Sequence, residues 1–230
     1  MRVGIVGDLH LPFAHPCYLD FCADVFDAWS VERVVMIGDV VDNHAISFWD
    51  ADPDGHSASR EADLALQMLD DWREMFVQAL VCVGNHDALH FRRAKKAGLP
   101  VRFLQDYGKV WGTPHWSWSF SHEIDGVRYE HGTGGSGPNA AITRAINNRC
   151  SLVMGHTHSS GGVRYHANRT DRIFGLNVGC GIDCDAYAFE YGRDFPNRPT
   201  LGCGIVIDGV QAFFEIMPCG PGEIYARSNK

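Results

Sequence analysis

Long apolar runs are missing from this chain of 230 residues, so no segment has the length of a membrane-spanning helix. Internal repeats, low-complexity tracts and linkers are also missing, and we expect a single domain over residues 1–230. Strand-like residues follow directly after Met1-Arg2, which leaves no room for a signal peptide. These absences favour a cytoplasmic protein with no membrane partner.

An excess of positive charge is also lacking. The chain has 20 Lys and Arg against 28 Asp and Glu, a formal net charge of −8. Binding to duplex DNA normally needs a basic face, so the charge does not favour a nucleic acid partner. It remains compatible with a small anion held by metal ions, because bound cations dominate the local field.

Zinc-ribbon spacing is absent from the eight cysteines. The pairs Cys17/Cys22 and Cys180/Cys184 lack it, and Cys82 lies inside an apolar run, as a buried small hydrophobic residue does. We therefore expect free thiols in a reducing compartment.

The first half of the chain contains the patterns of alternating strands and helices. Apolar runs rich in Val and Ile predict buried strands over 2–7, 33–37 and 79–83. Helices are predicted over 17–29, 58–76 and 87–97, with Ser57 or Ser59 capping the second and Asp87 opening the third. This alternation is typical of βαβ units and a largely parallel sheet. The rest of the chain is predicted to form a hairpin of 116–124 and 127–131, a helix over 139–149, and strands over 152–154, 162–166, 172–178, 202–207 and 210–217.

Five short polar motifs occur in order along these elements. They are Asp8-Leu9-His10, Gly38-Asp39-Val40-Val41-Asp42, Gly84-Asn85-His86-Asp87, His131-Gly132 and Gly155-His156-Thr157-His158. Their carboxylate, imidazole and amide groups suit Mn, Fe, Ni or Zn better than Ca. Asp8, Asp39, Asn85 and His156 each follow a predicted strand, and ligands gather at the carboxyl ends of such strands. We expect them on one edge of one sheet.

This ordered set of motifs, over about residues 3–180, resembles the calcineurin-like metallophosphoesterases. The resemblance implies an α/β fold, a four-layer α/β/β/α sandwich of two mixed sheets. The Asn177-Val178-Gly179-Cys180 turn, with Cys184-Asp185 nearby, looks like the small, capless branch found in bacteria and their phages.

Two divalent metal ions are implied by the resemblance, with Mn²⁺ expected and Fe, Ni or Zn as alternatives. One ion would be held by Asp8, His10, Asp39 and His158, and the other by Asp39, Asn85, His131 and His156. His122 is a rival to His131, but alternation places His122 in the middle of the hairpin. A hydroxide between the two ions would attack phosphorus in line, because two cations lower the pKa of water and neutralise charge on the phosphate.

The resemblance also implies a leaving-group acid, His86, oriented by the carboxylate of Asp42. Asn85 and His86 would contact substrate, and Arg92, by its position after the third motif, is a further candidate contact. Protein phosphatases of the superfamily have Arg-Gly where this chain has Asn43-His44, so a phosphoprotein is not the expected substrate. We expect a phosphodiesterase acting on nucleotide-type or small diesters. A phosphomonoesterase, a nuclease and a catalytically silent binding scaffold are alternatives.

Other patterns have simpler explanations. The Gly132–Gly137 stretch matches GxGxxG, but no acidic residue follows at the distance a dinucleotide site needs, which favours a loop at the edge of the site. The basic cluster Arg92-Arg93 with Lys95-Lys96 favours a solvated helix end, with a phosphate contact by Arg92 or Arg93 as the alternative. Hydrophobic packing is favoured over base stacking for Trp111, Trp116, Trp118 and Phe120. An ordinary polar loop is favoured over a calcium loop for Asp50, Asp52, Asp54 and His56.

Overall fold

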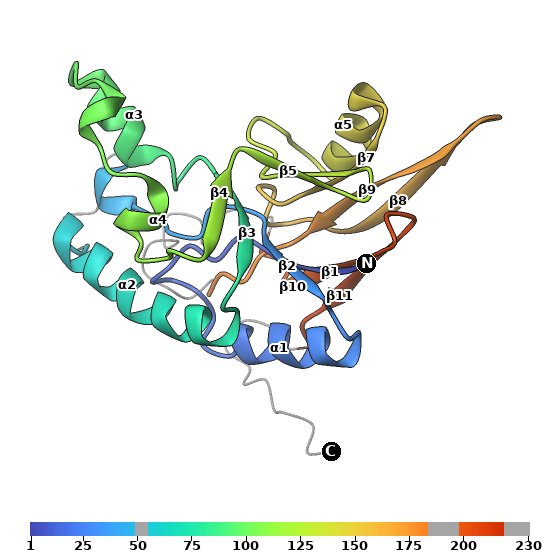
Figure 1. Cartoon of the computed structure of the whole chain (residues 1–230), viewed down its shortest axis with the longest axis horizontal. Helices are drawn as coiled ribbons and strands as arrows, with labels where there is room; N and C mark the ends of the chain where they lie inside the picture. The colour runs from blue at the N-terminus through green and yellow to red at the C-terminus, as the bar shows by residue number, and fades with distance from the viewer. Residues whose placement is uncertain (49–54, 184–197, 219–230) are drawn as a thin grey trace.

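A computed structural model describes residues 1–48, 55–183 and 198–218. Two mixed β-sheets form its centre, with helices on the outside (Figure 1). The first sheet has six strands, in the order β11 (Gln211–Ile216), β10 (Gly202–Ile207), β1 (Arg2–Val6), β2 (Arg33–Met36), β3 (Ala79–Cys82) and β4 (Trp116–Ser119). The second has five, in the order β5 (Ser121–Ile124), β6 (Val127–Glu130), β7 (Ser151–Met154), β9 (Arg172–Val178) and β8 (Gly161–Ala167).

Each sheet has a parallel centre and antiparallel outer strands. Strands β1 to β4 pair in parallel, while β10 and β11 pair antiparallel. In the other sheet β6, β7 and β9 are parallel, and β5 and β8 are antiparallel. The helices are α1 (Tyr18–Ala28), α2 (Ala58–Met75), α3 (Leu89–Lys96), α4 (Tyr107–Val110) and α5 (Ala140–Asn148), with 3₁₀ turns at His44–Ile46 (η1) and Val101–Phe103 (η2).

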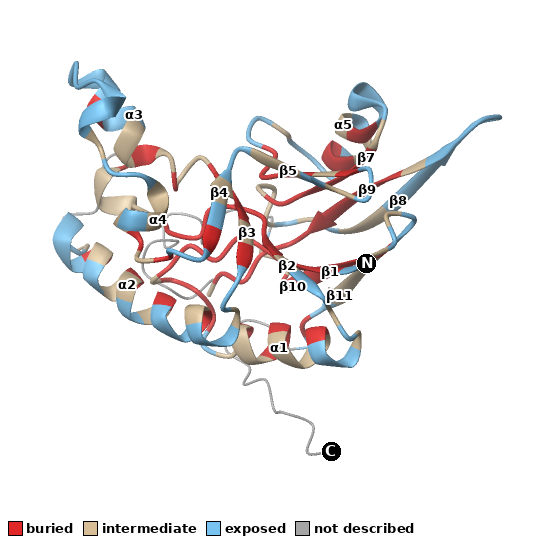
Figure 2. Ribbon diagram, viewed as in Figure 1, coloured by how far each residue is buried: buried red, intermediate tan, exposed pale blue. Residues whose placement is uncertain are grey.

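Three apolar cores separate four layers. One core lies between the sheets and includes Ile5, Ile37 and Leu176. A second packs α1 and α2 against the six-stranded sheet, and a third packs α5 against the five-stranded sheet. Figure 2 shows the buried residues concentrated along the strands. The fold is therefore the predicted α/β/β/α sandwich.

The predicted strand over 116–124 is wrong as a single element. It breaks at the exposed Phe120 into β4, which pairs with β3, and β5, which pairs with β6. The chain thus passes from the six-stranded sheet to the five-stranded sheet within one residue. Periodicity along the sequence does not reveal which neighbouring strand a strand pairs with. The hairpin turn at Asp125-Gly126 is present as predicted.

Helix boundaries otherwise agree with the prediction to within about two residues. Ser57 caps α2 by accepting a hydrogen bond from the backbone amide of Arg60 at 3.3 Å. Asp87 does not open α3, which begins at Leu89, because the Asp87 carboxylate is buried and bonded elsewhere.

The tryptophans are packing residues, as expected, but the prediction is wrong for Phe120, which is exposed where the chain passes between the sheets. Trp111 and Trp116 are buried, and Trp118 stacks on Tyr107 at 5.3 Å between ring centroids. Six cysteines are described, and all are free thiols. Asp50, Asp52 and Asp54 of the polar loop, and the Cys184-Asp185 pair, lie outside the described residues. Within the described part of the chain, no helix is long and apolar enough to cross a membrane.

Candidate metal centre

The five motifs meet where the carboxyl ends of the two sheets face each other. Asp8, Asp39 and Asn85 follow β1, β2 and β3 of the six-stranded sheet. His131 and His156 follow β6 and β7 of the five-stranded sheet. The expectation of one edge of one sheet is therefore wrong, since the site is built by both sheets.

Four predicted ligands form a first group, Asp8, His10, Asp39 and His158, whose ligand atoms lie within 4.8 Å of one another. His158 Nε2 lies 3.0 Å from Asp8 Oδ2, and His10 Nε2 lies 3.6 Å from Asp39 Oδ2. The two imidazole nitrogens, His10 Nε2 and His158 Nε2, are 3.2 Å apart. Two carboxylates and two imidazoles thus point at one small volume.

A second group shares Asp39 with the first and adds His131 and His156. His131 Nε2 is 3.1 Å from Asp39 Oδ2 and 3.2 Å from His156 Nδ1. The same nitrogen is 3.1 Å from Asn85 Oδ1, which brings the amide predicted as a ligand to this group. The structure therefore assembles all seven predicted ligands into two groups joined by one carboxylate.

His122, the rival of His131, is outside both groups. Its Nε2 lies 3.0 Å from the carbonyl oxygen of Val81 on β3. The geometry selects His131.

Close approach of the backbone is needed to build this centre. A Cβ atom at Gly84 would collide with Asp39 Oδ1, and one at Gly155 would collide with Asp8 Oδ1. His10, Asp39 and His156 have φ values of 51°, 47° and 69°, a region that non-glycine residues seldom occupy. Such conformations persist only where the surroundings impose them, and they cluster at functional sites.

The electrostatics of the cluster suit cations. Oδ1 of Asp8 is buried and has no hydrogen-bond donor among the described residues. Burial disfavours charge on His131, but the carboxylates of Asp39 and Asp8 outweigh it and raise the pKa of His131 to about 9. Burial likewise opposes charge on Asp39, yet His131 holds the pKa of Asp39 well below its usual range. Positive charge on His131 would compensate the carboxylates of Asp39 and Asp8. A divalent metal ion would compensate the same carboxylates, and the carboxylate and imidazole groups of the cluster are suitable ligands for one.

His86 belongs to neither of these two groups, but with His10 and Asp42 it forms a third set whose ligand atoms lie close enough to hold a metal ion. Its Nδ1 is 2.6 Å from the backbone carbonyl of Asp42 and 3.3 Å from Asp42 Oδ1. Burial favours the neutral ring, but the hydrogen bond with Asp42 and the charge of Asp39 raise the pKa of His86 to about 10. The ring is therefore held in a defined orientation, with Nδ1 toward Asp42.

Asp42 serves two imidazoles rather than one. Its Oδ1 is 2.5 Å from Nδ1 of His10, a shorter contact than the one to His86. This contact directs the other nitrogen of His10 toward the ligand group, the arrangement that fixes the tautomer of a metal-binding histidine. Burial by itself would raise the pKa of Asp42. The hydrogen bonds from His10 and His86 outweigh burial and lower this pKa far below its usual value.

Three supporting residues were not found from the sequence. Asp87 accepts hydrogen bonds from the backbone amides of Gly84 at 2.9 Å and Val41 at 3.2 Å, which ties two motif loops together. Asn43 donates to the carbonyl of His86 at 3.1 Å. The position of Asp87 inside a motif was a usable signal, since a buried carboxylate there must find donors.

Glu61 of α2 is the third. Its two oxygens accept from the amides of His44 and Ala45 at 2.6 and 2.8 Å, so this buried carboxylate fixes the η1 turn next to the site.

Arg92 and Arg93 have different surroundings. Arg93 Nε donates to the carbonyl of Ile46 at 2.7 Å and a second nitrogen donates to the carbonyl of Ser47, so this side chain is structural. Arg92 lines a cavity of about 300 Å³ together with Asn85 and His86. The structure thus brings together the three residues predicted to contact substrate.

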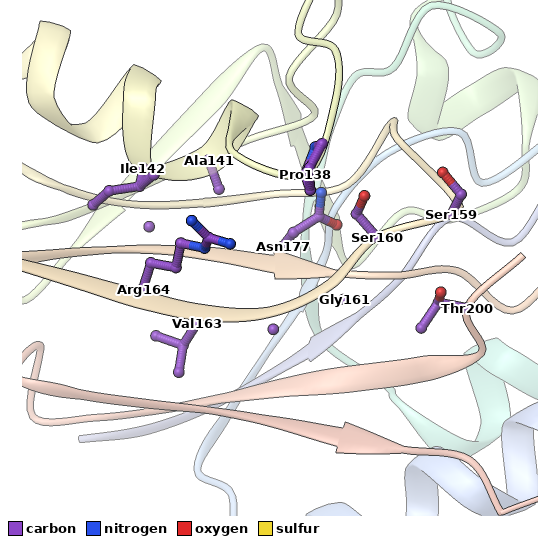
Figure 3. A pocket seen from close by; sticks show the side chains of 12 residues that line it. Pro138, Ala141, Ile142, Ser159, Ser160, Gly161, Val163, Arg164, Asn177 and Thr200 are labelled. Atoms are coloured by element: carbon purple, nitrogen blue, oxygen red, sulfur yellow. The ribbon is translucent and has the colours of Figure 1, made fainter. Parts of the chain in front are cut away.

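A second cavity, of about 350 Å³, lies between α5, β8 and the loop after His158 (Figure 3). Arg164 extends across it toward Asn177, and Ser159, Ser160 and Thr200 line the opposite end. Asn177 joins this cavity to the ligand loop by donating a short hydrogen bond to the hydroxyl of Thr157.

The chain is similar to several solved structures. Among solved structures, a novel archaeal phosphodiesterase is 15% identical with a TM-score of 0.49, covering 94% of this chain and 99% of that one. Vacuolar Protein Sorting 29 from Cryptosporidium parvum is 12% identical with a TM-score of 0.47, covering 93% and 86%. Yfce, a phosphoesterase from E. coli, is 15% identical with a TM-score of 0.39, covering 90% and 88%.

No curated protein matched the chain. The model of one protein family, described as calcineurin-like phosphoesterase, matches residues 1–177. This match covers most of the sequence and includes every residue of the two ligand groups. The chain belongs to the calcineurin-like phosphoesterase family.

Proposed function

We propose that the protein is a metal-dependent phosphodiesterase with two divalent ions per chain, acting on nucleotide-type or small phosphodiesters. The observation that carries the proposal is the sharing of Asp39 by two ligand groups. Asp8, His10 and His158 would hold one ion with Asp39, and Asn85, His131 and His156 would hold the other. Ions bound there, with Mn²⁺ as our first choice, would supply an activated water and neutralise charge on the phosphate.

The protein's own contribution is proton transfer and orientation. With Nδ1 of His86 held by Asp42, the opposite nitrogen is the one that donates to the leaving oxygen. Such a donor matters most when the leaving group is a poor one, such as an alkoxide. Asn85 and Arg92 would contact the substrate from the cavity that they share with His86.

Support for a diester of modest size comes from two features. Asn43 stands where protein phosphatases carry an arginine and donates to the carbonyl of His86, so its side chain braces the acid rather than gripping phosphate. The net charge of −8 provides little long-range attraction for long polyanions.

Elemental analysis combined with a turnover panel tests the proposal. The wild-type chain should bind two Mn²⁺ and hydrolyse bis-p-nitrophenyl phosphate and 2′,3′-cyclic nucleotides faster than p-nitrophenyl phosphate. Asp39→Asn should lose both ions and turnover, because one carboxylate serves both groups. Asp71→Asn, which changes an exposed carboxylate on α2, is the matched control and should keep both. Two ions and normal turnover in Asp39→Asn would contradict the shared-ligand assignment.

A further inference from the structure

The cavity beside His86 is lined by an aromatic, an apolar and a cationic side chain in addition to residues of the proposed centre. Hydrolysis of a phosphoester does not by itself require these three side chains. The cavity is lined by Ser47, Phe48, Asn85, His86, Leu89 and Arg92. Two of these, Asn85 and His86, belong to the proposed metal centre and acid. Because a general acid must lie within hydrogen-bond reach of the leaving oxygen, this cavity is on the side of the leaving group.

Its remaining walls are apolar, aromatic and cationic. Phe48 is 39% exposed although it is a large apolar residue, and Leu89 is buried beneath the cavity. The Arg92 guanidinium carbon lies 5.1 Å from the centre of the Phe48 ring. Among the described residues, no acidic side chain lines the cavity and none forms an ion pair with Arg92.

Hydrogen bonds from two sides hold the backbone that leads to the aromatic wall. Arg93 donates to the carbonyls of Ile46 and Ser47, and its guanidinium carbon lies 4.3 Å from the centre of the Phe48 ring. Glu61 fixes the preceding turn from α2 through the amides of His44 and Ala45. An exposed ring on a restrained backbone is suited to binding, because less conformational entropy remains to be lost.

We propose that this cavity selects an aromatic leaving group that carries a further negative charge, of which a nucleotide is the biological example. The aromatic base would lie against Phe48 and the second anionic group would meet Arg92, since aromatic rings and guanidinium groups both provide stacking surfaces for bases. In the reaction, water oxygen bonds to phosphorus and gives up one proton to the solvent, the bond from phosphorus to the leaving oxygen breaks, and that oxygen takes the proton from His86, which the solvent then replaces. The inference rests on the proposed function and assigns its substrate class.

Matched leaving groups test the aromatic wall. Methyl benzyl phosphate and methyl cyclohexylmethyl phosphate release alcohols of similar size and acidity, and only one is aromatic. Phe48→Leu should lower kcat/KM for the benzyl ester about threefold to tenfold, the usual range for one aromatic pair, and change the cyclohexylmethyl ester less than about twofold. Phe48→Tyr keeps the ring and should retain the wild-type ratio. An unchanged ratio in Phe48→Leu would overturn the aromatic assignment.

The cationic wall is tested with a 4-carboxybenzyl ester against the plain benzyl ester. Arg92→Gln should reduce the preference for the charged ester about tenfold to a hundredfold, as expected for losing one charge-assisted hydrogen bond. Lys95→Gln removes the same charge from an exposed position on the same helix, outside the cavity, and should leave the preference unchanged. If Arg92→Gln and Lys95→Gln change the preference equally, Arg92 acts only through the overall surface charge, and its assignment as the cationic wall is overturned.

A binding measurement separates this inference from the proposed function. If the Mn²⁺-loaded wild type hydrolyses no diester, the proposed function fails, and calorimetry with benzylphosphonate and cyclohexylmethylphosphonate then decides the inference. Tighter binding of benzylphosphonate, with the difference abolished in Phe48→Leu, supports the aromatic wall. Equal affinity, or binding of neither compound, overturns it.

Discussion

Replacing His86 by Asn removes the proposed proton donor while keeping the loop that carries it. The backbone amide of His86 donates to Asp39 Oδ1 at 2.8 Å, and this bond does not depend on the side chain. Asp42 keeps its shorter contact to His10, so the first ligand group retains its orientation. We therefore expect His86→Asn to bind two metal ions as the wild type does.

The size of the kinetic effect follows from the proton that is lost. The raised pKa of His86, about 10, favours the protonated ring at neutral pH, so the ring has a proton to donate. General acid catalysis contributes about 10²–10⁴, and we expect kcat/KM for an alkyl ester to fall by that factor in His86→Asn. This corresponds to about 3–5 kcal/mol of transition-state stabilisation.

A pair of esters measured on one preparation provides the assay. Methyl benzyl phosphate has a poor leaving group and should show the full loss, while bis-p-nitrophenyl phosphate, whose leaving group needs no proton, should lose less than about tenfold. His122→Asn is the control, because this imidazole bonds to the Val81 carbonyl outside both ligand groups. An equal loss on both esters, or loss of metal from His86→Asn, would refute the role of His86 as an acid.

Three further outcomes are expected. Because the pKa of His131 is about 9 without metal, Mn²⁺ should displace about one proton on binding and should bind more tightly as the pH rises toward 9. The heat of binding in calorimetry should therefore vary with the ionisation enthalpy of the buffer, and a heat that does not vary would contradict this expectation. Glu61→Ala should lower the free energy of unfolding by about 2 kcal/mol in urea titrations, since two backbone amides lose their acceptor, whereas Glu74→Ala at an exposed site of the same helix should change it little. A dinucleotide diester should be cleaved about as well as a long duplex, with weak salt dependence; a steep salt slope and strong preference for long DNA would point to a nuclease.

The order of elements could be predicted from local pattern because each strand and helix carries its own periodicity. Apolar runs located β1, β2 and β3, and a serine before a helical pattern located the start of α2. The segment 116–124 was predicted wrongly, since β4 and β5 follow each other with only Phe120 between them and yet pair with different sheets. Pairing across a sheet is decided by residues far along the chain, and a single sequence does not contain that information in readable form.

The supporting contacts of the site were hidden for a related reason. Asp87 precedes a helix and has the sequence signature of a cap, yet burial directs its carboxylate to the amides of Gly84 and Val41. Phe48 is an ordinary apolar residue in the sequence, and only its exposure beside His86 and Arg92 gives it a role.

The sequence by itself determined which chemical groups are available and where along the strands they occur, because ligand type and strand periodicity are both local properties. It named the seven residues of the ligand groups by their motifs. Only the tertiary structure decided that two sheets contribute them, that His131 rather than His122 faces Asp39, and that Asp42 holds both His10 and His86. These are distances between segments separated by many residues, and they are fixed by how the sheets pack against each other.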